Sequence, residues 1–218
     1  MIFQASTPSS ERTRIRRVAE LANYERHTLY DIIDAAYLCQ IAFHDEKGTH
    51  CIPMACWREG NHLYIHGSNG GRLMKLLSGC TQVCVAITHL DGLVLARSAF
   101  NHSMTYRSAA IYGSFERVSN EADKRAALDS FMDKIAPGRR TEVRPGNDKE
   151  FAATTVLRIA LDEAASKVRT GGATDDAEDL GIAVWAGILP LIQSRTTPVP
   201  DEHISVEEPV YVREWNQS

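Results

Sequence analysis

The residues with the clearest chemical potential lie in the sequence HLYIHGSNGGRLMKLLSG, residues 62–79. Apolar and polar residues first alternate as in a β-strand, and after a glycine-rich turn the leucines follow helical spacing. A turn of this kind before a helix presents backbone N–H groups to an anion. Ser68 can add a hydroxyl donor, while Arg72 and Lys75 can add positive charge from one helix face. The segment predicts an anion site, with an ordinary capped surface helix as the alternative.

A second polar cluster lies in the sequence RSAFNHSMTYRS, residues 97–108. Arg97 and Arg107 flank this loop, so both can reach one anionic or carbonyl group, and His102 and Ser103 can donate hydrogen bonds to it. The alternative is a dimer-interface loop whose polar groups satisfy one another. The two interpretations are compatible.

The elements that must position these clusters are mostly strands. Residues 28–36 predict a helix with a capping box at Thr28 and Asp31, and residues 120–136 an amphipathic helix capped by Ser119 or Asn120. Asp91-Gly92 predicts a hairpin turn, and residues 162–180 a solvated loop. The pattern predicts a sheet of about six strands or more, from residues 37–44, 49–58, 62–66, 81–90, 93–99, 106–118 and 154–161.

Three further features bear on a ligand site. Pro53 interrupts a predicted strand and therefore marks a sheet edge or a bulge. Residues 81–90 have one bulky face and one small face, which favours ordinary sheet packing and also allows a flat ring to lie close. Trp185 lies in an apolar connector and is either a core plug, which the pattern favours, or an aromatic lid over a planar ligand.

Composition limits the class of protein. The 218 residues fit one domain, with residues 1–24 as an N-terminal arm and 193–218 as a C-terminal tail, and 44% hydrophobic residues suffice for a core. A net charge of −4 gives no global attraction to nucleic acid or to an anionic membrane. No apolar run is long enough to span a bilayer and no signal-peptide core is present, so we expect a cytoplasmic protein. Five cysteines without a CxxC pair predict reduced structural thiols and no metal site.

As a set, these segments resemble the pyridoxamine 5'-phosphate oxidase-like superfamily of FMN-binding split β-barrels, in particular the flavin-nucleotide-binding branch related to nitroimidazole resistance proteins. The resemblance covers roughly residues 25–192. It rests on CIPMACW (51–57), LYIHGSNGGRLMKLL (63–77), VCVAITHLDGLVLARSAFNHSMTYRSAAIYG (83–113), ATTVLRIALDEAASKVRTG (153–171) and VWAGILPL (184–191). It implies a mainly β fold, a six-stranded antiparallel split β-barrel with flanking helices.

The resemblance also implies a homodimer with two FMN sites at the subunit interface. It places the FMN phosphate at Ser68, Arg72 and Lys75, with His66 beside it. The isoalloxazine ring would lie along the backbone of Ile52, Pro53 and Met54 and along the strand from Val85 to Thr88. Four more residues would come from the partner subunit or close the site, namely Tyr106, Arg107, Ser108 and Trp185.

The implied function is that of an FMN-dependent oxidoreductase acting on a small molecule. The flavin carries such chemistry, and His66 and His102 are the candidates for proton delivery because imidazole titrates near neutral pH. The tail sequence YVREWNQS does not match the Arg- and His-containing C-terminal segment of true pyridoxamine 5'-phosphate oxidases. Oxidation of vitamin B6 is therefore not expected. The alternative function is a non-catalytic module that stores or senses flavin or haem.

Overall fold

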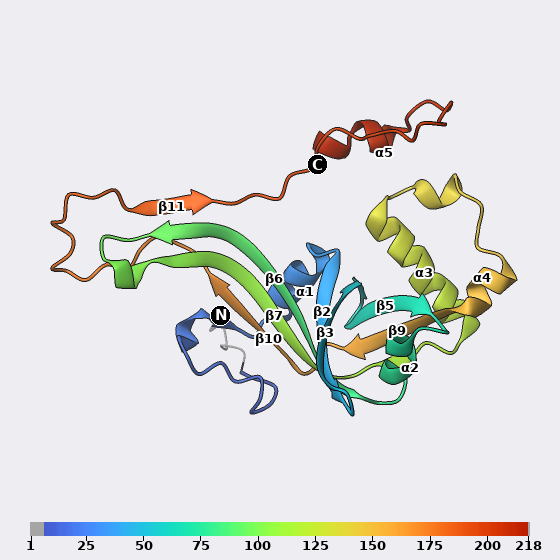
Figure 1. Ribbon diagram of the computed structural model, residues 1–218, viewed down its shortest axis with the longest axis horizontal. Helices are drawn as coiled ribbons and strands as arrows, with labels where there is room; N and C mark the ends of the chain where they lie inside the picture. Colours follow the sequence, from blue (N-terminus) through green and yellow to red (C-terminus); the bar gives the residue numbers. More distant parts are fainter. Residues whose placement is uncertain (1–6, 218) are drawn as a thin grey trace, which may run out of the picture.

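The computed structural model describes residues 7–217, which form two antiparallel sheets with peripheral helices (Figure 1). The larger sheet has the strand order β1-β10-β7-β6-β2-β3, with β11 paired to the outer part of β6. The smaller sheet has the order β4-β5-β9-β8. The strands of the larger sheet are β1 (Ala22–Asn23), β2 (Leu38–Asp45), β3 (Gly48–Ala55), β6 (Gln82–Leu95), β7 (Ser103–Ser114), β10 (Ala164–Arg169) and β11 (Gly187–Pro190). Those of the smaller sheet are β4 (Trp57–Glu59), β5 (His62–Ser68), β8 (Glu116–Arg117) and β9 (Thr154–Ala160).

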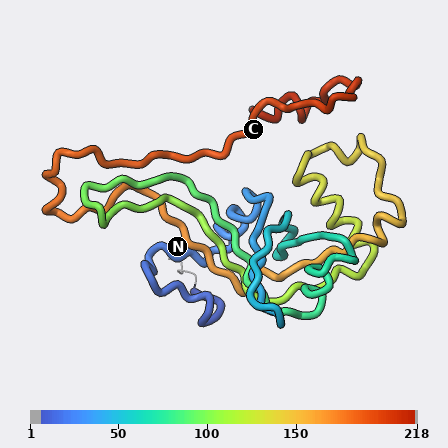
Figure 2. The backbone as a smooth tube through the Cα atoms, viewed as in Figure 1, coloured from blue at the N-terminus to red at the C-terminus, as the bar shows by residue number. Residues whose placement is uncertain are grey.

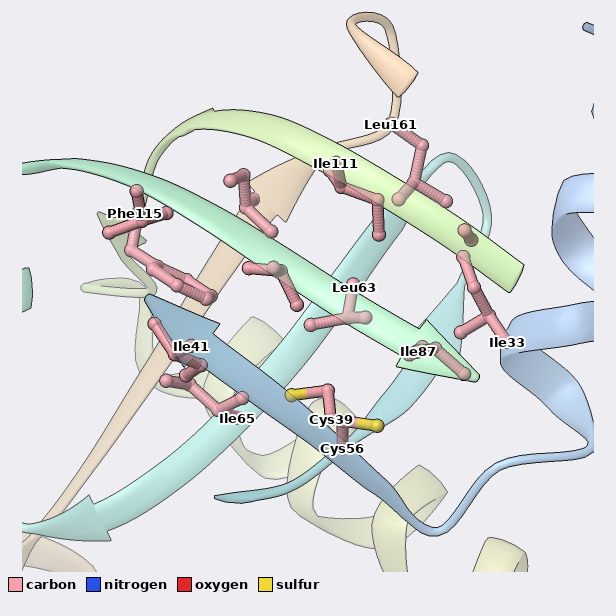
Figure 3. Close-up of a cluster of buried hydrophobic side chains, with 14 of the residues drawn as sticks. Ile33, Cys39, Ile41, Cys56, Leu63, Ile65, Ile87, Ile111, Phe115 and Leu161 are labelled. Carbon is pink, nitrogen blue, oxygen red and sulfur yellow. The ribbon is translucent and has the colours of Figure 1, made fainter. Parts of the chain in front are cut away.

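The two sheets enclose one apolar core, shown in Figure 3. Ile41 and Ile111 enter it from the larger sheet and Leu63 and Ile65 from the smaller one, and all four are fully buried. Burial of each such side chain stabilises the fold by about 1.5–3 kcal/mol. Helix α1 (Arg26–Asp34) adds its apolar side to this core. The predicted mainly β class with flanking helices is confirmed, with strands beyond the expected six.

Helix α3 (Glu121–Ile135) covers the outer face of the smaller sheet. Trp57 and Val156 from that sheet pack against Ala127 of the helix in a second apolar cluster. The side chain of Asn120 accepts a hydrogen bond from the backbone N–H of Asp123, which confirms the predicted cap. The remaining helices are α2 (Arg72–Leu77), α4 (Asp148–Ala153), α5 (Val210–Arg213) and the 3₁₀ turns η1 (Ala19–Leu21), η2 (Ala99–Asn101), η3 (Arg139–Thr141) and η4 (Trp215–Gln217).

Three sequence-based assignments are wrong. Asp91-Gly92 is no hairpin turn, because β6 continues through it with a bulge and the chain turns at residues 96–102. Helix α1 begins at Arg26 without a side-chain cap, so Thr28 is inside the helix. Residues 162–180 are not all loop, because β10 pairs with β7 along its whole length.

The β6–β7 hairpin extends beyond the barrel, and the chain beyond β11 runs back along it (Figures 1 and 2). Large apolar side chains remain exposed there, including Phe100 at 93% and Ile192 at 84% of their surface. The N-terminal segment docks on the sheet, where Arg12 and Ser10 bind the carboxylate of Glu163. Among residues 7–217, no helix is long and apolar enough to cross a bilayer.

Candidate functional site

The glycine-rich turn joins β5 to α2, as predicted. The N–H of Gly71 donates to the backbone oxygen of Ser68 at 2.9 Å, and the N–H of Gly70 donates to the Ser68 hydroxyl at 3.3 Å. A Cβ at position 71 would lie 3.1 Å from the Ser68 oxygen, so glycine suits this close approach. The N–H of Asn69 donates to the backbone oxygen of Ala153 at 2.9 Å and fixes the turn against α4.

Arg72 turns from α2 toward the end of the β2–β3 hairpin. Its guanidinium forms an ion pair with Asp45, and its Nη2 lies 3.5 Å from Nε2 of His50. The same His50 nitrogen lies 2.8 Å from Oδ1 of Asp45. The hydrogen bond from His50, the Lys47 N–H and the charge of Arg72 together lower the pKa of Asp45 to about 2. This contact brings α2 beside β3, although the two are distant in sequence.

Lys75 is exposed on α2 and has no carboxylate partner in the part of the chain that the structure describes. Its positive charge is therefore available to a ligand, whereas that of Arg72 is shared with Asp45. Asp45 and His50 could not be assigned to this site from the sequence, because residues 45–48 have only the pattern of a turn and His50 lies within a predicted strand.

Strand β3 forms one end of the larger sheet and pairs only with β2 within residues 7–217, so Pro53 lies at an edge as predicted. The side chain of Pro53 is exposed, while Ile52 and Met54 pack against the core. Val85 on β6 is completely buried. A ring lying along these strands would therefore meet backbone atoms and Pro53, and the side chains of Ile52, Met54 and Val85 face away from it.

His66 occupies a packing position on the α3 side of the smaller sheet. Its ring centroid lies 4.5 Å from that of Phe131 and 5.8 Å from that of Trp57. Burial lowers the pKa of His66, which favours the neutral ring, and its Nδ1 is buried without a hydrogen-bond partner among the described residues. His66 is thus poorly placed to deliver protons to a substrate.

The residues predicted for the partner's side of the site lie on the outward part of the β6–β7 hairpin. Arg107 binds the carboxylate of Asp91 with two hydrogen bonds of 2.9 and 2.8 Å, and Ser108 lies directly across from Thr88. Tyr106 pairs with Leu90 on β6. Thr88 and Arg107 line a cavity of about 450 Å³ that is closed on another side by residues 191–193.

The expected convergence of Arg97 and Arg107 is wrong. Arg97 lies at the tip of the hairpin, where its Nη1 and N–H bind the carboxylate of Asp175 at 2.7 and 2.9 Å. Arg107 lies further along the hairpin toward the barrel, where it is across from His89, and it has its own partner, Asp91. Each arginine is held by a different aspartate, so no single anion joins them.

His102 and Trp185 also lie toward the hairpin tip. Nδ1 of His102 is 2.9 Å from the backbone oxygen of Ser98 and the side chain is exposed. Trp185 is 61% exposed and packs over Gly187 at the start of β11, so the core-plug interpretation is wrong. The predicted site residues therefore form two groups in one chain, one around α2 and β3 and one on the hairpin.

A family model described as pyridoxamine 5'-phosphate oxidase matches residues 25–168. No curated protein matches the sequence significantly. The flavocytochrome Anf3 from Azotobacter vinelandii is a similar solved structure, with 36% identity, a TM-score of 0.91, and coverage of 96% of this chain and 98% of that chain. An FAD- and haem-binding protein from Mycobacterium smegmatis is 33% identical, with a TM-score of 0.85 and coverage of 90% and 97%.

A more distant similarity is to a Bacteroides thetaiotaomicron structure assigned to 5-nitroimidazole antibiotic resistance. It is 24% identical, with a TM-score of 0.57 and coverage of 67% of this chain and 86% of that chain, which indicates a shared fold. The match to the flavocytochrome covers nearly the whole chain and therefore includes most of the β6–β7 hairpin and of the tail.

Proposed function

This chain belongs to the pyridoxamine 5'-phosphate oxidase-like family, and from that premise we propose that it binds a flavin and serves as a flavin-dependent oxidoreductase for a small molecule. The observation that carries the proposal is the position of Arg72 beside the edge strand β3, with the exposed Lys75 three residues further along the same helix. Cationic side chains next to an unpaired strand edge suit a ligand with a phosphate at one end and a flat ring at the other.

The phosphate end of the flavin would be held by side chains of α2 and the preceding turn. Lys75 supplies a charge that no carboxylate of the described chain neutralises, and Arg72 supplies a planar donor whose direction Asp45 fixes. The Ser68 hydroxyl, which already accepts a hydrogen bond from Gly70, donates its own hydrogen to a phosphate oxygen.

The ring end would lie along the outer edge of β3. Backbone groups of Ile52 and Met54 offer hydrogen bonds there, and Pro53 offers an apolar contact. When bound, a flavin supplies one- and two-electron transfer, and the protein supplies position and electrostatics. Neither His66 nor any other side chain is required as a nucleophile.

A homodimer would complete the site. Tyr106, Arg107 and Ser108 lie on β7 and Trp185 lies just before β11, whereas Arg72 lies on α2, and in this proposal a second copy contributes the first four of these residues. The exposed apolar side chains of the hairpin and tail support such a dimer interface, since a monomer rarely leaves so many large apolar side chains exposed to water. A compact small-molecule substrate would then approach the ring between the two chains.

The flavin expected from the family resemblance is FMN, whereas the similar Mycobacterium smegmatis protein is described as FAD- and haem-binding. FAD includes the whole FMN unit, so the same residues of this chain suit both. Mass spectrometry of the cofactor released by heat from the purified protein distinguishes the two flavins.

The experiment that tests this proposal is the double substitution Arg72→Ala/Lys75→Ala. Loss of hydrogen bonds to a charged phosphate costs about 1.5–3 kcal/mol each, so flavin affinity should fall by at least about a hundredfold. Arg213→Ala/Lys149→Ala removes the same charges elsewhere and should bind flavin normally. Equal flavin affinity in the double variant and the wild-type protein would refute the site.

A second candidate function is electron transfer between flavin and haem, favoured by two full-length similar structures and by His102. The backbone oxygen of Ser98 can only accept, so Nδ1 of neutral His102 carries the hydrogen and Nε2 keeps the lone pair that haem iron requires. Exposed Phe100 and Met104 lie on the same tip. Haemin addition should give a Soret band that His102→Ala loses and His203→Ala retains.

A further inference from the structure

A cavity of about 620 Å³ lies between β8, α3 and α4, on the side of the smaller sheet that faces away from the barrel core. Three cationic residues line it, Arg117, Lys124 and Arg125. Its apolar lining includes Val118 and Val156, which also belong to the cluster under α3. Cavities of this volume are typical of sites for small molecules.

The three cations differ from most others in the protein. Most arginines of residues 7–217 are ion-paired, for example Arg144 with Glu150 at 2.8 Å in the adjoining cavity. Within the same range, Arg117, Lys124 and Arg125 form no ion pair. Three positive charges around one cavity repel one another, and an anion placed between them would remove that repulsion.

Lys124 is the buried member, with 9% of its surface exposed. Its Nζ donates to the backbone oxygen of Phe151 at 2.6 Å and lies 4.0 Å from the centroid of the Phe151 ring. The guanidinium carbon of Arg125 lies 4.1 Å from the same centroid. The carbonyl of Phe151 thus holds Lys124 and its ring contacts both cations, which keeps them in place for an anion.

Two carboxylates also line the cavity, Glu121 and Asp148, and both are exposed. Burial and then the charge of Arg117 lower the pKa of Lys124, the charge of Glu121 opposes them, and the direction overall is downward. Neither Glu121 nor Asp148 forms an ion pair with the buried ammonium group.

We propose that this cavity is a second binding site, which takes the phosphate of a small phosphate ester. Lys124 and the guanidinium groups of Arg117 and Arg125 bind the phosphate oxygens, because planar guanidinium forks match that group. Val118, Val156 and the ring of Phe151 contact the organic part of the ester. None of Ser68, Arg72 and Lys75 lines this cavity, so the site is separate from the proposed flavin site and goes beyond the proposed function.

The test uses adenosine monophosphate and inorganic phosphate as probes, titrated calorimetrically into the flavin-loaded full-length protein. Adenosine monophosphate should bind more tightly than inorganic phosphate. Lys124→Met and Arg117→Gln should each weaken its binding about tenfold or more, as expected for a hydrogen bond to a charged group. Arg144→Gln is the matched control and should leave binding unchanged, because Arg144 is already paired with Glu150.

Absence of binding for both probes at millimolar concentration would overturn the proposal. So would an equal loss of affinity in Arg144→Gln, which would indicate only general attraction to a basic surface. Arg117 is exposed, so Arg117→Gln remains informative even where Lys124→Met impairs folding.

The same variants separate this site from the flavin site. Arg117→Gln should keep normal flavin affinity, and Arg72→Ala/Lys75→Ala should keep normal affinity for adenosine monophosphate. If Arg117→Gln lost flavin while Arg72→Ala/Lys75→Ala kept it, this cavity would be the cofactor site. That result would refute both the proposed flavin site and the proposed phosphate-ester site. Loss of flavin in the double variant alone, with no probe binding by wild-type protein, would refute only the second site.

Discussion

The guanidinium of Arg72 already has a carboxylate partner, and this decides how it can serve a phosphate. Asp45 binds Arg72 on one side and His50 on the other, so the three side chains join the β2–β3 hairpin to α2. A phosphate must share the guanidinium with Asp45 or displace it. Asp45 thus orients Arg72 and also competes with the phosphate for its guanidinium. Lys75 is therefore expected to supply much of the attraction for the phosphate.

At the residue scale, the low pKa of Asp45 predicts a pH-dependent contribution to stability. The folded-state pKa of about 2 lies below the ordinary value of about 3.9, so the folded protein favours the ionised carboxyl. That contribution is complete above about pH 4 and is lost as the pH falls through about 2. The free energy of unfolding, measured with urea, should be lower for Asp45→Asn than for wild type at pH 6, and the difference should shrink below pH 4.

The matched control is Glu46→Gln, which removes the next carboxyl in the chain. Glu46 has no ion pair in the described part of the protein, so its removal should not give this pH dependence. A constant difference between Asp45→Asn and wild type from pH 6 to 2.5 would contradict the role assigned to Asp45.

At the element scale, Gly92 allows β11 to pair with β6. A Cβ at this position would lie 2.9 Å from Oγ1 of Thr105, 3.0 Å from Cγ2 of Ile188 and 3.0 Å from the backbone oxygen of Leu189. The last of these contacts is with the backbone of β11, so alanine or any larger residue at position 92 fits only if β11 moves.

Gly92→Ala should therefore release β11 from the hairpin. The amides of residues 187–189 should exchange with deuterium faster than in wild type, because the pairing of β11 with β6 opens more often. Gly172→Ala serves as the control, since a Cβ there meets nothing within 4 Å. Unchanged protection of β11 in Gly92→Ala would show that the strand tolerates the added methyl group.

The elements that could be predicted from the sequence are those whose signals are local. Asn120 caps α3, one of the two residues that the sequence offered for that cap. The hairpin turn predicted at Asp91-Gly92 was wrong because these two residues serve contacts between strands. Asp91 binds Arg107 across the hairpin, and Gly92 leaves room for β11. A local pattern cannot separate a turn glycine from one that permits close packing.

The candidate site shows the same limit. Ser68, Arg72 and Lys75 could be chosen as candidates because they lie around one turn of the chain. The contact of Arg72 with Asp45 joins residues 27 positions apart, and only the fold reveals it. The packing of His66 against Phe131 could not be predicted either, because it depends on α3, which lies far along the sequence.

At the scale of the whole molecule, the outward β6–β7 hairpin and the extended tail favour assembly. Phe100, Ile192 and Val199 are each more than four-fifths exposed, and such side chains in number are typical of an interface. Light scattering should give a mass of about twice the 24.2 kDa of the chain. Deletion of residues 193–218 should reduce that mass or weaken the association, and a wild-type monomer at micromolar concentration would contradict the proposed two-chain site.

The measurement that most directly tests the flavin proposal is the visible absorption spectrum of the purified protein, recorded before and after FMN is added and the excess removed. The proposal predicts a retained two-banded flavin spectrum. It also predicts that Arg72→Ala/Lys75→Ala loses this spectrum, while the control Arg213→Ala/Lys149→Ala, which removes the same charges elsewhere, keeps it. A folded protein that stays colourless after incubation with FMN and with FAD would contradict the central claim.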